Sequence, residues 1–101
     1  MTIELSEADF NSQTANRKGL LLFYKMNCPF CKTMEAVIDK FAKAHPDVIL
    51  FGVDFEGQKA LADRFQVERA PTLLVLKDGR VTAQKSGLMN PKELAAFYQQ
   101  A

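Results

Sequence analysis

Two stretches of the chain are apolar with no alternation between apolar and polar positions. Leu20–Tyr24 is apolar throughout, and Val48–Asp54 is interrupted only by Gly52 and by its final aspartate. Short runs of this kind are typical of central strands that helices cover on both faces, because neither face has to be polar. We therefore expect two buried, neighbouring strands.

The segment between these two runs has the periodicity of a helix. Its apolar positions follow the i, i+3, i+4, i+7 spacing of one buried stripe, and they are Met34, Val37, Ile38 and Phe41. His45-Pro46 ends the helix, because the residue before a proline avoids helical backbone angles. A strand, a helix and a strand with short loops predict a βαβ unit, with parallel pairing and a right-handed crossover.

Before this unit, the sequence indicates one more strand and one more helix. Thr2–Leu5 is a short strand candidate. Ser6 is expected to cap a helix that places Glu7 and Asp9 in its first turn and runs to about Asn16.

After the unit, Gln58–Phe65 is a further helix candidate, and two strands are expected at Thr72–Lys77 and Val81–Ser86. Asp78-Gly79 lies between these two strands. Asp-Gly between apolar runs is a strong hairpin signal, so this pair should be antiparallel.

The last helix has a complete start signal. Asn90 can serve as the N-cap, Pro91 fits the first helical position, and Glu93 can close a capping box. The helix should bury Leu94 and Phe97 and run to the end of the sequence. The expected order is βαβαββα, with a fourth helix between the second long strand and the hairpin, in a single α/β domain over residues 1–101.

Composition narrows the possible partners and location. The net charge is only +1, from 13 basic and 12 acidic residues, so no whole-protein field attracts nucleic acid or a membrane surface. No apolar run approaches the roughly 18 residues that a membrane helix needs. The first residues also lack the pattern of a signal peptide. We expect a cytoplasmic protein, in which two cysteines are more often redox-active or metal-binding than a permanent cross-link.

Cys28 and Cys31 lie just after a predicted strand, where a helix begins. There the first amides have no intrahelical partner, and the helix dipole places partial positive charge. A thiolate at Cys28 can accept hydrogen bonds from the amides of Phe30 and Cys31, and Pro29 fits the first helical position. We expect a lowered pKa for Cys28 and a shielded, resolving role for Cys31.

Two structural interpretations of the cysteines are weaker. A disulfide closing a four-residue loop would stabilise the fold by only about 2 kcal/mol in the chain-entropy model. Structural zinc requires four ligands, whereas Cys28, Cys31 and the single histidine, His45, supply three, and His45 lies at the far end of the helix. We expect neither a metal nor another cofactor.

The chain resembles the thioredoxin family over essentially its whole length. The matching segments are Leu20–Tyr24, Cys28-Pro29-Phe30-Cys31-Lys32, Val53-Asp54, Ala70-Pro71-Thr72-Leu73, Lys77-Asp78-Gly79 and Gly87. The resemblance implies a thioredoxin fold, in which helices flank a central mixed β-sheet on both faces, and dithiol–disulfide exchange as the chemistry.

The resemblance also implies roles for individual residues. Pro71 would be cis and pack against the cysteine pair, and Ala70 would offer its backbone to a substrate peptide. Tyr24 stands where these proteins usually carry an aromatic residue under the active-site loop, and core packing explains it equally well. The docking surface would consist of Pro29, Phe30, Pro71 and Gly87.

Two departures from the family pattern matter. Thioredoxins usually have Trp-Cys-Gly-Pro-Cys, whereas Asn27 precedes this pair and Pro-Phe lies inside it, closer to the Pro-Tyr of glutaredoxins. Thioredoxins also usually bury an aspartate and a lysine where this chain has Leu22 and Leu50. Both charges are gone together, so neither is left unpaired. The usual buried proton acceptor is therefore absent.

The sequence thus predicts a monomeric enzyme that exchanges thiols with disulfide-containing protein substrates and is regenerated by a reductase. The alternatives are a glutathione-linked, glutaredoxin-like reductase and a non-catalytic binding module in which the cysteines are incidental.

Overall fold

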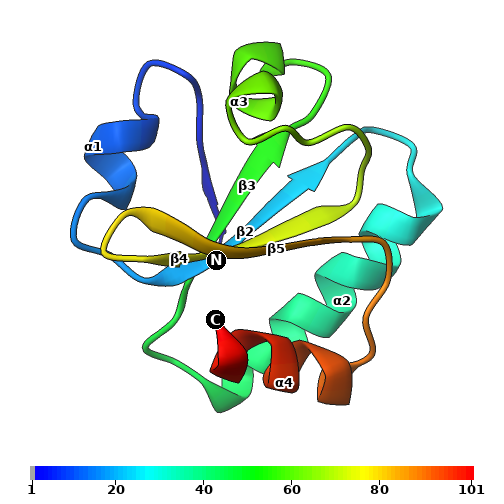
Figure 1. Ribbon diagram of the computed structural model, residues 1–101. Helices are drawn as coiled ribbons and strands as arrows, with labels where there is room; N and C mark the ends of the chain where they lie inside the picture. The colour runs from blue at the N-terminus through cyan, green and yellow to red at the C-terminus, as the bar shows by residue number, and fades with distance from the viewer. Residues whose placement is uncertain (1) are drawn as a thin grey trace.

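The computed structural model describes residues 2–101, which form five strands and four helices (Figure 1). In chain order these are β1 (Thr2–Glu4), α1 (Phe10–Thr14), β2 (Gly19–Tyr24), α2 (Pro29–Ala44), β3 (Ile49–Asp54), α3 (Lys59–Arg64), β4 (Thr72–Lys77), β5 (Arg80–Ser86) and α4 (Pro91–Gln100). The order of elements agrees with the expected one, including the fourth helix before the hairpin.

All five strands form one mixed sheet in the order β1-β3-β2-β4-β5. β3 runs parallel to both β1 and β2, with Leu20 opposite Leu50. β4 runs antiparallel to β2 and forms the hairpin with β5. The two apolar runs are therefore adjacent, buried strands, as their lack of alternation predicts.

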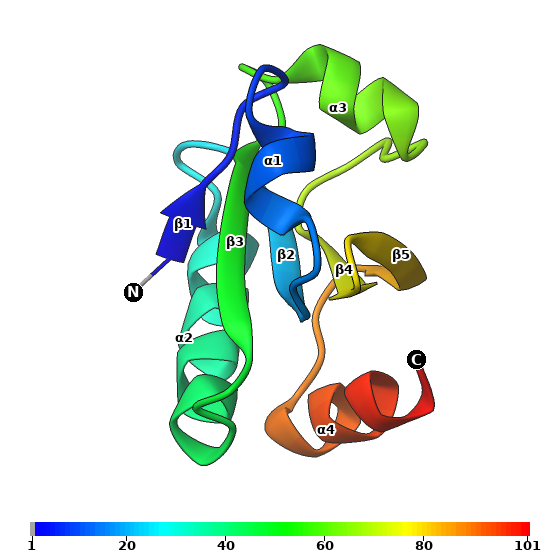
Figure 2. The ribbon, with the colours of Figure 1, turned by 90° about the vertical axis from the view of Figure 1, so that its left-hand side faces the viewer.

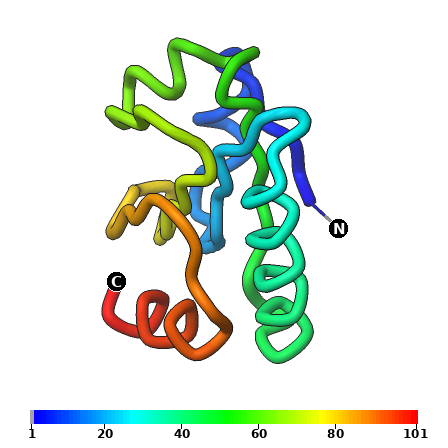
Figure 3. Tube along the Cα trace, turned by 90° about the vertical axis from the view of Figure 1, so that its right-hand side faces the viewer, coloured from blue at the N-terminus to red at the C-terminus, as the bar shows by residue number. Residues whose placement is uncertain are grey.

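Helices cover both faces of the sheet, and each face has its own core. α1 and α3 pack on one face, where Phe10 and Leu61 meet Phe51. α2 and α4 pack on the other, where Met34 and Leu94 join the second core. Figure 2 shows α2 and α1 on opposite sides of the sheet, and Figure 3 shows α4 beside the lower half of α2. The fold thus has three layers.

The expected start of the first helix is wrong. α1 begins at Phe10, its N-cap is Asp9, and its first turn carries no acidic side chain. Ser6 instead lies in a turn, where its amide and hydroxyl both donate to the Asp9 carboxylate, over 2.7 and 3.1 Å. Serine and aspartate side chains bond readily to nearby backbone outside helices, so this local turn replaces the first helical turn.

The turn and cap signals further along the chain are confirmed. Asp78 and Gly79 both have positive φ, at 53° and 77°, which suits the two-residue hairpin turn. Asn90 accepts from the amide of Glu93 over 2.7 Å, and Glu93 accepts from the amide of Asn90 over 3.0 Å. Both orphan donors at the start of α4 are thereby satisfied.

Candidate active site around Cys28 and Cys31

Three chain segments meet at one end of the sheet because of strand register. β2 ends at Tyr24 and leads into α2, while Phe23 pairs with Thr72 at the start of β4. Thr72 in turn pairs with Ser86 at the end of β5. The register therefore places the cysteine loop, the residues before β4 and the residues after β5 at a common end of the sheet.

The backbone turns sharply between β2 and α2. Asn27 has a φ of 56°, a left-handed conformation that asparagine adopts more readily than most residues. Cys28 follows as the extended N-cap of α2, and Pro29 takes the first helical position. Asn27 stands where thioredoxins usually carry a tryptophan, and asparagine suits the left-handed backbone that this turn adopts.

The two cysteines form a disulfide at the start of α2, with their Cα atoms 5.2 Å apart. The Cys31 amide donates a hydrogen bond to Cys28 Sγ over 3.1 Å. Cys28 Sγ therefore lies at the positive end of the helix dipole and receives one of the amides that the helix leaves unpaired. The same position would stabilise a thiolate.

Exposure distinguishes the residues of the tetrapeptide. Cys28 and Cys31 are 7% and 3% exposed, whereas the Phe30 side chain between them is 63% exposed. Pro29 is exposed as well. The sulfur atoms thus lie beneath an apolar rim that faces solvent.

The turn before β4 is held by three hydrogen bonds. The Ala70–Pro71 peptide bond is cis, and the Gly87 amide donates to the Pro71 carbonyl over 2.9 Å. Thr72 Oγ1 donates to the Arg69 carbonyl over 2.7 Å and lies 2.9 Å from Ser86 Oγ. Gly87 has a φ of 91°, which favours glycine. These contacts tie the Pro71 turn to the end of β5.

Sequence reasoning missed three residues at this end of the sheet. Met26 and Leu88 are large apolar side chains that are 70% and 45% exposed, although they adjoin the cysteine loop and Gly87. The sequence signal was an apolar residue in a loop next to a site residue, with Met26 two positions before Cys28 and Leu88 directly after Gly87. The third is Thr72, which is fully buried and which the sequence predicted only as the first residue of a strand.

Tyr24 is half-buried, and its hydroxyl donates to Glu4 Oε1 over 2.8 Å. Burial of the hydroxyl raises the pKa of Tyr24, and the hydrogen bond to Glu4 raises it further. The ring also packs against the α2-side core. The structure thus gives Tyr24 a packing contact and links it to β1.

Leu22 and Leu50 are buried members of the α2-side core, 6% and 5% exposed. They lie on neighbouring strands, with Leu22 opposite Gly52 and Leu50 opposite Leu20. Where the resemblance implies a buried ion pair, this chain has apolar packing.

Among residues 2–101, no group of three or more His, Cys, Asp and Glu side chains is placed to hold a metal ion. His45 is the C-cap of α2 and stacks on Phe41, with ring centroids 4.1 Å apart. Within the same residues, no helix has the length and apolar character needed to cross a membrane.

A mixed sheet of this order, with a redox-capable cysteine pair at the start of α2, defines a class of thiol–disulfide oxidoreductases. The model of the thioredoxin family matches residues 1–100, and the chain belongs to the thioredoxin family. The expected thioredoxin fold is confirmed, and thiol–disulfide oxidoreductase is the general activity that this membership supports.

Individual relatives agree with this assignment. The chain is 30% identical to a thioredoxin of Haemophilus influenzae, covering 97% of this chain and 94% of that one. It is 32% identical to a thioredoxin 2 homologue of Streptomyces coelicolor, covering 76% of this chain but 58% of that longer protein. The reduced form of desulfothioredoxin from Desulfovibrio vulgaris Hildenborough superposes with a TM-score of 0.84 at 36% identity, covering 98% of this chain and 97% of that one.

Proposed function

We propose that the protein exchanges dithiol for disulfide with protein substrates, with Cys28 as the nucleophile and Cys31 as the resolving cysteine. The observation that carries the proposal is the hydrogen bond from the Cys31 amide to Cys28 Sγ at the start of α2. Because this amide and the helix dipole favour negative charge on Cys28, the reduced site presents a thiolate at the more exposed of the two cysteines.

The exchange proceeds in two balanced steps. The Cys28 thiolate attacks one sulfur of a substrate disulfide, a mixed disulfide forms, and the other substrate sulfur leaves as a thiolate. Cys31 then attacks Cys28 Sγ, which forms the intramolecular disulfide and releases the second substrate thiolate. Two electrons pass from the cysteine pair to the substrate, and an external reductase returns them.

The proton of Cys31 needs an acceptor in the second step. Leu22 is an alkyl side chain in the buried core and cannot take a proton. We assign the proton to the departing substrate thiolate or to water at the rim, since both reach the sulfurs from the exposed side. Resolution should therefore depend on access of the leaving group to Cys31.

The substrate surface that we propose consists of the exposed rim and the Pro71 turn. Phe30 and Pro29 offer apolar area beside the sulfurs, while Ala70 offers its backbone groups to an extended peptide. Pro71 and Gly87 complete the surface, because their hydrogen bond holds the turn beside β5. Tyr24 supports the loop from below.

Single-cysteine variants test the proposal. With disulfide-bonded insulin as the probe, Cys31→Ser should accumulate a mixed disulfide, whereas Cys28→Ser should neither trap insulin nor reduce it. Preferential alkylation of Cys31 in the reduced wild type at neutral pH would reverse the two roles. Thr33→Ser, an exposed change next to the pair on α2, is the matched control and should leave turnover intact.

The choice of electron donor separates the proposal from its alternatives. Turnover supported by a flavin-dependent thioredoxin reductase fits the protein-disulfide role, and turnover supported by glutathione alone would favour the glutaredoxin-like alternative. Partner binding that survives loss of both cysteines, with no exchange by the wild type, would favour a binding module. We place the protein in the reducing cytoplasm as a monomer with one domain, where such a cysteine pair is kept available.

A further inference from the structure

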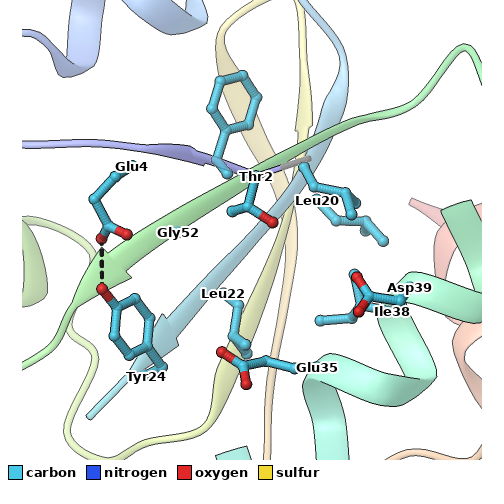
Figure 4. Close-up of a pocket in the computed structure, with 11 residues that line it drawn as sticks. Thr2, Glu4, Leu20, Leu22, Tyr24, Glu35, Ile38, Asp39 and Gly52 are labelled. Atoms are coloured by element: carbon cyan, nitrogen blue, oxygen red, sulfur yellow. Dashed lines mark hydrogen bonds between the residues drawn. The ribbon is translucent and has the colours of Figure 1, made fainter. Parts of the chain in front are cut away.

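A hollow of about 240 Å³ opens between α2 and the β1 edge of the sheet. Its walls come from β1, β2, β3 and α2, as Figure 4 shows. Gly52 forms part of its floor. A Cβ atom at Gly52 would lie 3.3 Å from Thr2 Cγ2 and 3.4 Å from both Glu4 Oε2 and Tyr24 Cε1. Even a methyl group at Gly52 would therefore crowd the three side chains that border the hollow.

The base of the hollow is apolar. Leu20, Leu22, Leu50 and Ile38 line it, and all four are buried. Leu22 and Leu50 are the residues that replace the charged pair of other thioredoxins. The base can therefore desolvate an aliphatic chain without leaving a buried charge unpaired.

The rim of the hollow is acidic on both sides. Figure 4 shows Glu4 on the β1 side and Glu35 and Asp39 on the α2 side. Glu35 and Asp39 are four residues apart, so they lie on the same face of α2. Among residues 2–101 the ion pair joins Lys18 and Asp47, so within these residues Glu4, Glu35 and Asp39 form no salt bridge.

The contact between Tyr24 and Glu4 places negative charge at the mouth of the hollow. Glu4 Oε1 accepts from the Tyr24 hydroxyl, while Oε2 is the carboxylate oxygen that faces the space above Gly52. Besides burial and Glu4, the charges of Asp54 and Glu35 also raise the pKa of Tyr24. Negative potential therefore converges at the mouth, and the aromatic ring adds a face that attracts cations.

The volume restricts the size of the occupant. Drug-sized ligands occupy pockets of roughly 300–1,000 Å³, so this hollow suits a smaller, linear molecule. An apolar base with an anionic rim complements a chain that ends in a cation.

We propose that the hollow binds a small primary amine with an unbranched aliphatic chain of about four to six carbons, similar in length to a lysine side chain. The chain lies against the apolar base, where Leu22 and Ile38 retain 6% and 5% exposure, and the ammonium group lies at the mouth between the rim carboxylates Glu4 and Glu35. The site contains no sulfur, and it shares two residues with the redox site: Tyr24, which supports the cysteine loop, and Leu22, which lies in the same core.

Amide chemical-shift titration of the isotope-labelled full chain tests the proposal with three matched probes. Pentylammonium should shift the amides of Leu22, Glu35 and Gly52 in a saturable way and bind about fivefold tighter than pentanol, the upper end of what an exposed ion pair contributes. Pentanoate should bind most weakly. Equal affinities for the three probes, or no saturable shift with pentylammonium, would overturn the proposal.

Variants locate the site and its charge. Glu4→Gln and Glu35→Gln should each weaken pentylammonium by about fivefold and leave pentanol unchanged. Glu68→Gln, an exposed carboxylate after α3, is the matched control and should change neither. A loss of affinity in the Glu68 variant equal to that in the other two would reveal non-specific charge attraction and overturn the site.

Gly52→Ala fills the floor and should abolish binding of both pentylammonium and pentanol. If this variant is folded by its amide spectrum and still binds the amine, the location is wrong. If it does not fold, the two carboxamide variants decide the question. A capped lysine that binds tighter than pentylammonium would also overturn the proposal, since the occupant would then be a side chain of a protein partner.

Discussion

The backbone amide of Cys31 donates a hydrogen bond to Cys28 Sγ over 3.1 Å, across the first turn of α2. The two sulfurs are therefore chemically unequal before any substrate arrives. Cys28 is an N-cap that accepts a hydrogen bond, whereas Cys31 is inside the helix and more deeply buried. The two cysteines differ because only Cys28 lies at the helix N-terminus and accepts a backbone amide.

The pKa of Cys28 should lie well below the ordinary thiol value of about 8.5. In the Cys31→Ser variant, the rate of alkylation by iodoacetamide should reach half its maximum at a pH below that value. The same variant unfolded in urea is the control, because its thiol has no helix terminus beside it. A folded midpoint at or above the unfolded one would show that the helix start does not stabilise the thiolate.

The cysteine couple should be more oxidising than a typical thioredoxin. A carboxylate near the pair would oppose thiolate formation by like-charge repulsion, and Leu22 removes that opposition. Reference potentials are about −270 mV for thioredoxin and roughly −200 to −230 mV for glutaredoxins. We expect a value between them or near the glutaredoxin range, measured by equilibration against glutathione or dithiothreitol buffers.

Leu22→Asp should lower this potential and destabilise the fold, since Leu50 offers the new charge no partner. Leu20→Asp is the matched control, because it is also buried on β2 but lies two residues further from the cysteines. It should destabilise the fold with a smaller change in potential. A wild-type potential at or below the thioredoxin value would mean that the missing carboxylate does not dominate.

Thr72→Val should cost about 1–3 kcal/mol of unfolding free energy, because it leaves the Arg69 carbonyl without its donor. Valine keeps the shape of threonine and is favoured in strands, so packing should change little. Exchange activity should fall as well, since the Pro71 turn loses one of its ties. Urea unfolding and insulin reduction measure the two effects.

Thr82→Val is the control for this prediction. Thr82 is exposed on β5, and its hydroxyl makes a long contact of 3.4 Å with the Val75 carbonyl. Both stability and activity should stay close to wild type. Equal losses in the two variants would mean that Thr72 acts only as a strand residue.

Asn90→Ala should destabilise the protein by about 1 kcal/mol, because it removes one half of the capping box of α4. Turnover should be unchanged, since the cap lies outside the cysteine loop and the Pro71 turn. Gln99→Ala, an exposed change on the same helix, is the comparison and should have almost no effect. A loss in turnover with stability intact would contradict a purely structural cap.

Tyr24 should make stability fall at alkaline pH. Burial and the Glu4 hydrogen bond raise the pKa of Tyr24 in the folded state, so the folded chain holds a proton that the unfolded chain releases near its ordinary pKa of about 10. The stabilisation is complete below that pH and is lost as the pH rises toward the folded pKa. Unfolding measured from pH 8 upward should show this slope in the wild type.

Tyr24→Phe should flatten the alkaline slope, because it removes the hydroxyl whose pKa the fold raises. A slope that persists in Tyr24→Phe would place the responsible group elsewhere.

Several features of the fold could be predicted because their causes lie within a few residues. The Asp78-Gly79 turn needs only two residues that tolerate positive φ, and the Asn90 box needs only its own first turn. The position of Cys28 at a helix start follows from the apolar run before it and the helical stripe after it. The prediction failed at Ser6, where two local motifs compete: a cap for a helix and a turn closed by Asp9.

Periodicity and local hydrogen bonding were enough to predict the order of elements, the two buried parallel strands and the cysteine pair at the start of α2. They could not predict which distant residues meet, because those contacts depend on how the strands pair. Strand register sets Thr72 against Ser86 and brings Gly87 to Pro71. The pairing of β1 with β3 sets Glu4 opposite Gly52, where its carboxylate reaches the Tyr24 hydroxyl. Such contacts depend on the relative placement of strands far apart in the chain, which no local pattern encodes.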